Sequence, residues 1–197
     1  MIEQLLISGK LGDGCLVRRN ENSNAFIMFN STTMDYLIHK KVELEKAGIG
    51  TTRITYGTSG YIKNKKIPKF TTRVDKRITK VYDMSKLECI KNLDKIGLIY
   101  LFLDDGSLHK KKLFGNIYCN TFNDIEVSEL INKINYYYPL ANAKKLYDRK
   151  KDGRCYPYII IHKLGMLEFL KDIQEFVIKY DINDMFYKAG LPSTTIS

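Results

Sequence analysis

The sequence predicts an α+β fold made of two pseudo-symmetric αββαββα repeats, each with its own antiparallel sheet. Two observations support this prediction. The apolar stretch Leu5–Leu11 ends in Gly12-Asp13-Gly14, and a second stretch, Ile96–Leu103, ends in Asp104-Asp105-Gly106. Each is long enough for a short helix and stops at a glycine, the usual residue just past a helix end. The same order of strand-like and helical patterns then follows each stretch, which indicates an internal repeat.

The residues after Asp13 follow the order strand, strand, helix, strand, strand. Apolar and polar residues alternate in the strand-like pieces, and apolar residues recur at helical spacing between them until Gly48. Turn-prone residues at 20–23 and 57–60 separate the strands of each pair. The predicted elements are strands at 15–19 and 25–30, a helix at 33–47, and strands at 51–56 and 69–74.

The residues after Asp105 repeat this order and add a final helix. The pattern predicts strands at 107–111 and 115–121, a helix at 125–136, strands at 143–147 and 156–162, and a helix at 164–179. We therefore divide the chain into a first repeat (1–83), a linker with a short helix (84–94) and a second repeat (95–197). Because both copies lie in one chain, we expect a monomer. Aromatic residues at periodic apolar positions, such as Tyr136–Tyr138, Phe169 and Phe176, are expected in the core.

Composition and charge narrow the class of protein. Lysine and arginine number 32 against 22 acidic residues, a formal net charge of +10. This excess favours a polyanionic partner, although a protein from an AT-rich genome would also show it. No apolar run approaches the roughly 20 residues of a membrane-spanning helix, and the first residues lack the features of a signal peptide. We expect an intracellular protein with no membrane partner. The four cysteines form no CxxC pair, which argues against structural zinc or a disulfide framework.

An aspartate at the C-terminal end of a helix lies beside unpaired carbonyls and the negative end of the helix dipole. If the two apolar helices pack side by side in parallel, Asp13 and Asp105 come together as a cluster of oxygen ligands that repel one another without a cation. Mg²⁺ prefers such ligands together with phosphate. A site of this kind can activate water and stabilise both the transition state and the leaving 3′ oxygen of a phosphodiester. One Asp-Gly helix end alone is common, so the repetition is what predicts a site.

The two stretches Leu6–Gly14 (LISGKLGDG) and Leu98–Gly106 (LIYLFLDDG) resemble the two motifs of the LAGLIDADG endonucleases. The likeness is to the single-chain, intron-encoded type of yeast mitochondria, and it includes the tail Met185–Pro192. It implies a homing endonuclease whose antiparallel sheets form a DNA-binding saddle, and it implies cleavage of a long double-stranded DNA site. The metal would be Mg²⁺ or Mn²⁺, with Ca²⁺ supporting binding without cleavage. The likeness favours a mitochondrial, organelle-encoded protein over a bacterial or phage one.

The resemblance also implies roles for further residues. Backbone carbonyls before each aspartate would face the metal, at Gly12 and Asp104. Polar side chains of the second strands, Asn30 and Asn120, would hold water near the site.

The resemblance further implies one lysine from each half near the cleaved phosphates. Lys188 fits the tail, and Lys80 is its expected first-half counterpart, with Arg73 and Lys163 as competitors for the role. Ser8 and Tyr100 stand where many members have glycine in the seam between the helices.

Basic residues gather in the predicted hairpins, on sheets that need helices on only one face. Hairpins of this kind can enter the major groove while flanking cations contact phosphates, although charged hairpin tips also serve solubility. The expected DNA-binding residues are Arg18, Arg19, Arg53, Lys63, Lys65, Lys66, Lys69, Arg73, Lys110, Lys111, Lys112, Lys144, Lys145, Arg149, Lys150, Lys151, Arg154 and Lys163.

Two alternatives to a nuclease use the same fold. An intron maturase would bind intron RNA and assist splicing, and a regulator would bind DNA without cutting it. Net charge does not separate these functions. The presence of both Asp13 and Asp105 favours cleavage, because a protein that only binds nucleic acid has no chemical need for paired carboxylates.

Overall fold

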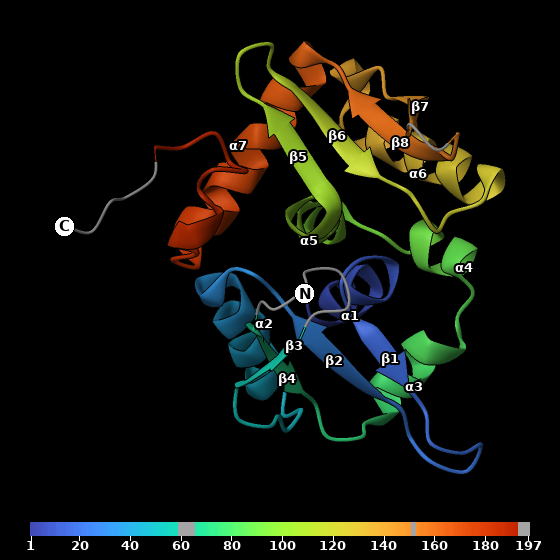
Figure 1. Ribbon diagram of the computed structural model, residues 1–197, viewed down its shortest axis with the longest axis vertical. Helices are drawn as coiled ribbons and strands as arrows, with labels where there is room; N and C mark the ends of the chain where they lie inside the picture. Colours follow the sequence, from blue (N-terminus) through green and yellow to red (C-terminus); the bar gives the residue numbers. More distant parts are fainter. Residues whose placement is uncertain (59–65, 151–152, 193–197) are drawn as a thin grey trace.

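A computed structural model of the chain describes residues 1–58, 66–150 and 153–192. In these residues, two four-stranded sheets have matching strand orders, β1-β2-β4-β3 and β5-β6-β8-β7, and all neighbouring strands are antiparallel. The two sheets lie on either side of a central pair of helices, α1 and α5 (Figure 1). The matching orders confirm the predicted α+β fold with an internal repeat.

The first half contains one sheet and three helices among the described residues. Its strand β3 starts later than predicted, because Thr51 forms only an isolated bridge with Thr72. The elements are α1 (Ile2–Leu11), β1 (Cys15–Val17), β2 (Phe26–Asn30), α2 (Met34–Lys46), β3 (Thr55–Thr58), β4 (Lys66–Thr71) and α3 (Lys76–Asp83).

The second half repeats the order, after a short helix in the connecting segment. Among the described residues, no helix has both the length and the apolar character needed to cross a membrane. The elements are α4 (Lys86–Lys91), α5 (Lys95–Asp105), β5 (Gly106–His109), β6 (Phe114–Tyr118), α6 (Asp124–Tyr137), a 3₁₀ turn (Pro139–Ala141), β7 (Lys144–Arg149), β8 (Cys155–Ile161), α7 (Lys163–Lys179) and a second 3₁₀ turn, η2 (Asn183–Met185).

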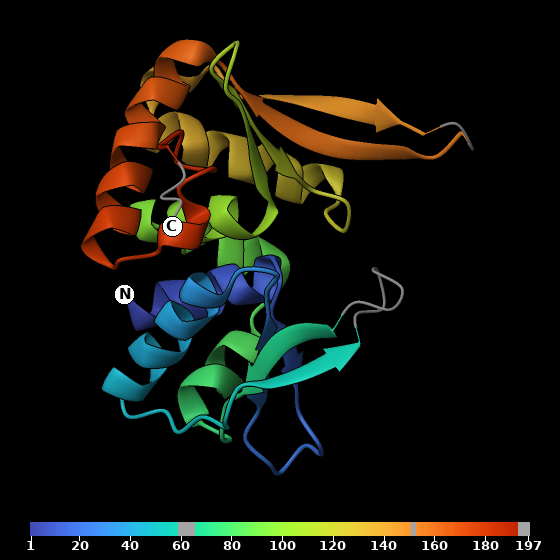
Figure 2. The ribbon, with the colours of Figure 1, turned by 60° about the vertical axis from the view of Figure 1, so that its left-hand side comes forward.

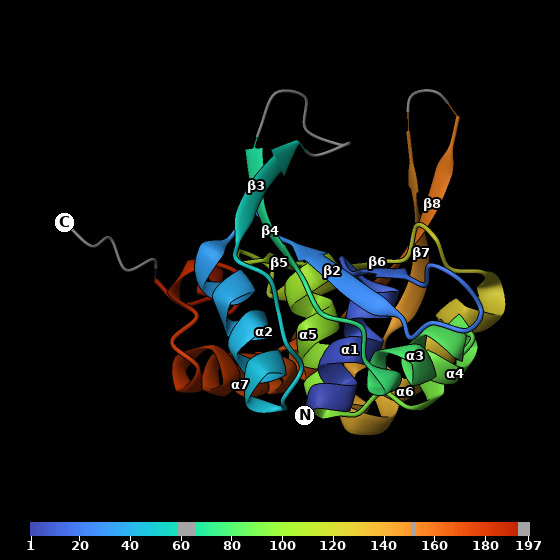
Figure 3. The same cartoon turned by 90° about the horizontal axis from the view of Figure 1, so that it is seen from below.

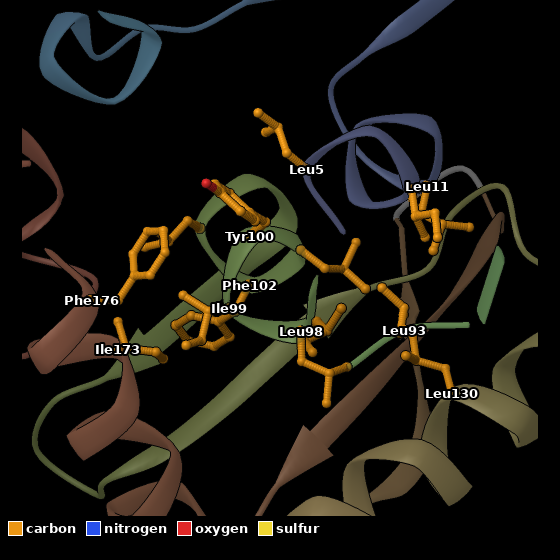
Figure 4. Close-up of a cluster of buried hydrophobic side chains, with 14 of the residues drawn as sticks. Leu5, Leu11, Leu93, Leu98, Ile99, Tyr100, Phe102, Leu130, Ile173 and Phe176 are labelled. Carbon is orange, nitrogen blue, oxygen red and sulfur yellow. The ribbon is translucent and has the colours of Figure 1, made fainter. Parts of the chain in front are cut away.

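Helices α1 and α5 pack in parallel, N-terminus beside N-terminus. The side-chain amide of Gln4 donates to the carbonyl of Asn92 (2.9 Å) and accepts from the backbone N–H of Asp94 (2.9 Å), just before α5 begins. Gly97 allows this approach, since a Cβ there would lie 2.3 Å from the Gln4 Oε1. The ring of Tyr100, a position expected in the seam, lies against Tyr36 and His39 of α2. The same ring points toward Phe176 of α7 (Figure 4), and Gly97 provides the close contact one turn earlier.

Each sheet covers the helices with one face and leaves the other face free. In β2, Ile27 and Phe29 are buried against the helices, whereas Asn30 is exposed on the opposite face. This alternation follows from the period of two along a strand. The hairpins β3–β4 and β7–β8 extend beyond the helices on the same side of the molecule (Figures 2 and 3). Met28 and Asn30 of the first sheet and Tyr118 of the second line one cavity between the free faces, and we call the surface formed by these two faces and this cavity the groove.

Each half also packs a following segment onto the other half. Helix α4 lies against α6, and η2 lies against α2, which is the matching helix of the first repeat (Figure 1). The carboxylate of Asp184 accepts hydrogen bonds from the backbone N–H groups of Asp35 (2.7 Å) and Tyr36 (3.3 Å) at the start of α2. Because α4 and η2 each pack on the opposite half, the residues after η2 and the residues before α4 lie at the centre of the molecule.

Candidate active site

Asp13 and Asp105 lie together at the C-terminal ends of α1 and α5, below the groove. Gly12 makes this possible, because a Cβ there would lie 3.0 Å from Asp105 Oδ2 and 3.1 Å from the Cβ of Asp104. Both aspartates line one cavity of about 570 Å³. Gly12, Asn30 and Asn120 line the same cavity, so the structure brings five of the predicted site residues together.

The two carboxylates share an unfavourable environment for negative charge. Burial raises the pKa of Asp105 to about 7, and the charges of Asp13 and Asp104 add to the effect. Burial also raises the pKa of Asp13, followed by the charge of Asp104. Lys188 and Lys40 oppose the shift at both aspartates. A cluster of this kind stores repulsion that a bound cation would relieve.

A second, smaller cavity of about 230 Å³ lies on the other side of Asp13. Its lining includes Asp13, Asn30, Asp104 and Lys188. The Lys188 ammonium donates to the backbone carbonyls of Leu103 (2.6 Å) and Asp104 (3.1 Å) at the end of α5. Burial lowers the pKa of this lysine, and the three surrounding carboxylates counteract the shift. The predicted position of Lys188 beside the paired aspartates therefore agrees with the structure.

Lys40 is a site residue that the sequence analysis missed. It projects from α2 and its ammonium lies 2.6 Å from Asp104 Oδ1, with both side chains only 1% exposed. Lysine at an internal position of an amphipathic helix is normally taken as a surface charge, so the helical pattern gave no signal. Asp104 accepts from Lys40 through its carboxylate Oδ1 and from Lys188 through its backbone carbonyl.

The structure places the side chain of Lys80 away from the paired aspartates. Its ammonium pairs with Glu3 (2.8 Å) near the N-terminus of α1, whereas Asp13 follows the C-terminus of that helix. The helix has 10 residues, which separates its two ends by about 15 Å. Both members of the pair are also exposed, as expected for a surface ion pair.

Lys86 is the first-half lysine that the structure places beside the site. Lys10 of α1 donates to the carbonyls of Val81, Tyr82 and Met84, which holds the end of α3 and the residue after it against the end of α1. Lys86 then donates to the carbonyl (2.7 Å) and hydroxyl (3.0 Å) of Thr121, a residue that lines the larger cavity. The sequence did hold a signal, since Asp83-Met84-Ser85-Lys86 is similar to Asp184-Met185-Phe186-Tyr187-Lys188.

The donor set at the larger cavity fits a hard divalent cation that keeps some of its waters. Within the described part of the chain, no three His, Cys, Asp or Glu side chains gather into a metal site. Asp13 and Asp105 would therefore be the protein's two carboxylate ligands, with oxygen atoms of water and phosphate completing the shell, as Mg²⁺ prefers. The Gly12 carbonyl remains a candidate ligand. The carbonyl of Asp104 accepts a hydrogen bond from Lys188 instead.

The basic residues predicted to bind DNA divide into several groups. Lys69 lies on the free face of the first sheet, paired in register with Asn30 and Thr55. Lys144 lies on the free face of the second sheet, in register with Ile160. Arg19, Arg53, Lys66, Lys110, Lys111, Lys112, Arg149, Lys150 and Arg154 are exposed in the hairpins and loops, and Lys63, Lys65 and Lys151 lie outside the described residues.

Four of these basic residues have other surroundings than predicted. Lys145 pairs with Asp124 at the start of α6 (2.9 Å), because it alternates with Lys144 and so faces the helices. Arg18 holds the β1–β2 loop through the carbonyl of Ser23 and pairs with Asp83. Arg73 and Lys163 lie at the ends of β4 and β8 away from the hairpin tips, and neither lines the cavities at the aspartates.

Comparison with known proteins agrees with this geometry. The sequence profile of the LAGLIDADG DNA endonuclease family matches residues 6–169. The homing endonuclease I-WcaI bound to its DNA recognition sequence is 22% identical, with a TM-score of 0.70 over 97% of this chain and 86% of that chain. I-DmoI in complex with DNA and Ca is 12% identical, with a TM-score of 0.57 over 87% and 88% of the two chains.

The N-terminal LAGLIDADG domain of DUF199/WhiA is similar as well, at 14% identity and a TM-score of 0.53 over 87% of this chain and 83% of that chain. None of the curated proteins is similar enough in sequence to match. At these levels of identity the solved structures establish the shared fold.

Proposed function

Because the chain belongs to the LAGLIDADG DNA endonuclease family, we propose that it hydrolyses one phosphodiester on each strand of a long, asymmetric duplex DNA site. Such breaks would promote the mobility of the genetic element that encodes it. The observation that carries this proposal is the meeting of Asp13 and Asp105 at the ends of two parallel helices, beneath a groove with basic hairpins. A pseudo-twofold pair of carboxylates matches the pseudo-twofold relation of two DNA strands.

Duplex DNA would lie along the groove, with the hairpins β3–β4 and β7–β8 in the major groove. Lys69 and Lys144 face the groove from the two sheets and would contact phosphates or base edges. The long extent of two sheets end to end suits a site too long for one recognition helix. A net charge of +10 favours this association through counterion release.

Asp13 and Asp105 would hold Mg²⁺ or Mn²⁺, which activates water and neutralises charge on the phosphate when bound. Around that centre, the side-chain amides of Asn30 and Asn120 would orient water in the larger cavity. Lys188 and Lys86 would each place a cation at one flank of the carboxylate pair, where negative charge develops on a cleaved phosphate. We expect the protein to act as a monomer, because one chain supplies both aspartates.

Cleavage selection tests this function directly. The protein would be incubated with a randomised duplex DNA library and Mg²⁺, and cut ends would be sequenced for the wild type, Asp13→Asn and Asp105→Asn. We expect one long, pseudo-symmetric site that both variants fail to cut while still binding it in Ca²⁺. Asp124→Asn, which alters an exposed carboxylate outside the cavities, is the matched control and should cut normally.

Two other results would redirect the assignment. Enrichment of bound DNA without any break in the wild type would contradict cleavage and favour a DNA-binding regulator. Selective binding of intron RNA over duplex DNA, with no break, would favour a maturase. An elution volume in gel filtration corresponding to twice the monomer mass would contradict the monomeric site.

A further inference from the structure

The two halves differ in charge at two pairs of matching positions next to the aspartates. Asp104 precedes Asp105 as Gly12 precedes Asp13, and Lys40 stands ten residues after Asn30 as Leu130 stands ten residues after Asn120. Lys40 and Leu130 are both buried, at 1% and 0% exposure. Lys40 and Asp104 therefore occupy the positions that match Leu130 and Gly12 across the pseudo-twofold axis.

The Lys40–Asp104 pair crosses from the first half to the second. The ammonium of Lys40, on α2, lies 2.6 Å from Asp104 Oδ1, at the end of α5. It also lies over the rings of Tyr36 (4.2 Å to the centroid) and Phe29 (5.0 Å). Buried charges persist only when they are paired in good geometry. Since leucine and glycine fill the matching place without charge, the fold itself does not require an ion pair there.

Asp104 lies beside only one of the two cavities at Asp13. It lines the smaller cavity together with Lys188, whereas Asp105 lines the larger one. A phosphate entering the smaller cavity would meet the ammonium of Lys188 and, behind it, the carboxylate of Asp104. Lys40, which does not line this cavity, neutralises that carboxylate. Without Lys40, the negative charge of Asp104 would act on the phosphate through a medium of low dielectric constant.

We propose that Lys40 is a positioning residue and counter-ion that makes the smaller cavity a phosphate site, so that cutting of one DNA strand depends on the Lys40–Asp104 pair and cutting of the other strand does not. The inference rests on the proposed endonuclease function. It adds that cutting of the two strands depends unequally on the Lys40–Asp104 pair. The shared Asp13 and the matching topology of the halves do not predict this difference.

Strand-resolved single-turnover cleavage of the selected DNA site tests the inference. The two strands would carry different fluorescent labels, and Lys188→Met would first identify the strand whose phosphate lies in the smaller cavity. We expect Lys40→Gln, which keeps a hydrogen-bond donor but removes the charge, to slow cutting of that same strand by about tenfold. The other strand should change by less than about threefold, a contrast that a general loss of folded protein would not produce.

A double variant separates charge balance from any direct role of the pair. Lys40→Leu combined with Asp104→Gly recreates the residues found at Leu130 and Gly12, and it removes both charges together. Replacement of a buried ion pair by apolar residues is usually tolerated, so this variant keeps the test valid if Lys40→Gln does not fold. We expect the double variant to change the cutting rates of the two strands by nearly the same factor. Lys41→Leu, which changes an exposed pair with Glu45 on the same helix, is the control.

The contrary outcomes are distinct. Equal slowing of both strands by Lys40→Gln, slowing of the strand that Lys188→Met spares, or a double variant no better than Lys40→Gln would overturn the inference. If the wild type makes no break, the proposed endonuclease function is wrong. The inference is then tested separately by duplex binding in Ca²⁺. Binding weakened about threefold by Lys40→Gln and recovered in the double variant would support the counter-ion, and unchanged binding would overturn it.

Discussion

The first and second halves of the molecule share a topology but differ in how charge is placed around the aspartates. The sheets have the same strand order, and Asp13, Asn30 and Lys86 have counterparts in Asp105, Asn120 and Lys188. The likeness ends at a pair of buried charges, because Lys40 of the first half pairs with Asp104 of the second, whereas the matching positions hold Leu130 and Gly12.

The difference separates two kinds of constraint on a duplicated fold. Residues that must serve a symmetric ligand, such as two antiparallel DNA strands, remain paired across the pseudo-twofold axis. Residues that support only one cavity are free to diverge, provided that burial and packing are satisfied. The Lys40–Asp104 ion pair and the uncharged Leu130 and Gly12 stand at matching positions of the fold, and only the ion pair places charges beside the aspartates.

The largest effect should come from replacing Lys188 and Lys86, the lysines proposed to flank the paired aspartates. Lys188 contacts the end of α5 at the smaller cavity, and Lys86 contacts Thr121 at the larger cavity. We expect Lys188→Met and Lys86→Met each to slow one strand by about 100-fold, and each to slow a different strand. The measurement is the rate of each nick on a doubly labelled duplex.

Lys80→Met provides the control for this prediction, because its ammonium pairs with Glu3 far from the aspartates. It should leave both strand rates unchanged. If Lys86→Met and Lys188→Met slowed the same strand, the proposed correspondence between the two halves would be wrong.

The next effect concerns stability and its dependence on pH. The pKa of Asp105 rises from 3.8 to about 7 on folding, so the folded protein holds a proton that the unfolded chain releases between these values. Stability contributed by the protonated group is therefore complete below pH 3.8 and is lost as pH rises through 7. Between pH 5 and pH 8 we expect the free energy of unfolding to fall by about 2 kcal/mol without divalent metal.

Urea denaturation at the two pH values measures this change. Asp105→Asn removes the titrating group, so it should flatten the dependence and stabilise the protein at pH 8. A millimolar concentration of Mg²⁺ should also reduce the loss, since a cation offsets the repulsion between the carboxylates. An equal pH dependence in Asp105→Asn and wild type would contradict the role assigned to Asp105.

A smaller effect distinguishes the two ends of the α1–α5 pair. A Cβ on Gly97 would lie 2.3 Å from the Gln4 Oε1, which is held by the backbone of Asp94, so Gly97→Ala should destabilise the fold by about 2 kcal/mol. A Cβ on Gly12 would meet Asp105 Oδ2 at 3.0 Å. Gly12→Ala should therefore slow cleavage about tenfold with little change in stability. Similar stability losses in both variants would show that the site end is no more adaptable than the opposite end.

Much of this arrangement follows from sequence patterns alone. The repeated Asp-Gly helix ends and alternating strands predict the two sheets and the meeting of Asp13 with Asp105. Periodicity also places Tyr138, Phe169 and Phe176 in the core, which the structure confirms. Tyr136 is 75% exposed, because neighbouring residues at a helix end point to different sides.

What sequence could not reveal depends on contacts between the halves. Lys40 is an internal lysine of a helix, and only the packing of α2 against the end of α5 gives it a buried partner. Lys80 and Lys86 are both lysines close to the connecting segment, and the choice between them depends on the exchange of α4 onto α6. Pairings across 35 or 64 residues, as for Lys86 and Lys40, have no local signature in the chain.

The smallest effect compares one basic residue on each face of the sheets. Lys69 shares the free face with Asn30, whereas Lys145 faces the helices and pairs with Asp124. Lys69→Ala should weaken duplex affinity about fivefold and lower the slope of log affinity against log salt by about one, as expected for a lost phosphate contact. Lys145→Ala should change neither quantity. Anisotropy titrations over a range of salt concentrations in Ca²⁺ measure both variants. If Lys145→Ala lowered the slope as much as Lys69→Ala, strand alternation would not select the residues that meet DNA, and the groove would extend around the hairpin edge.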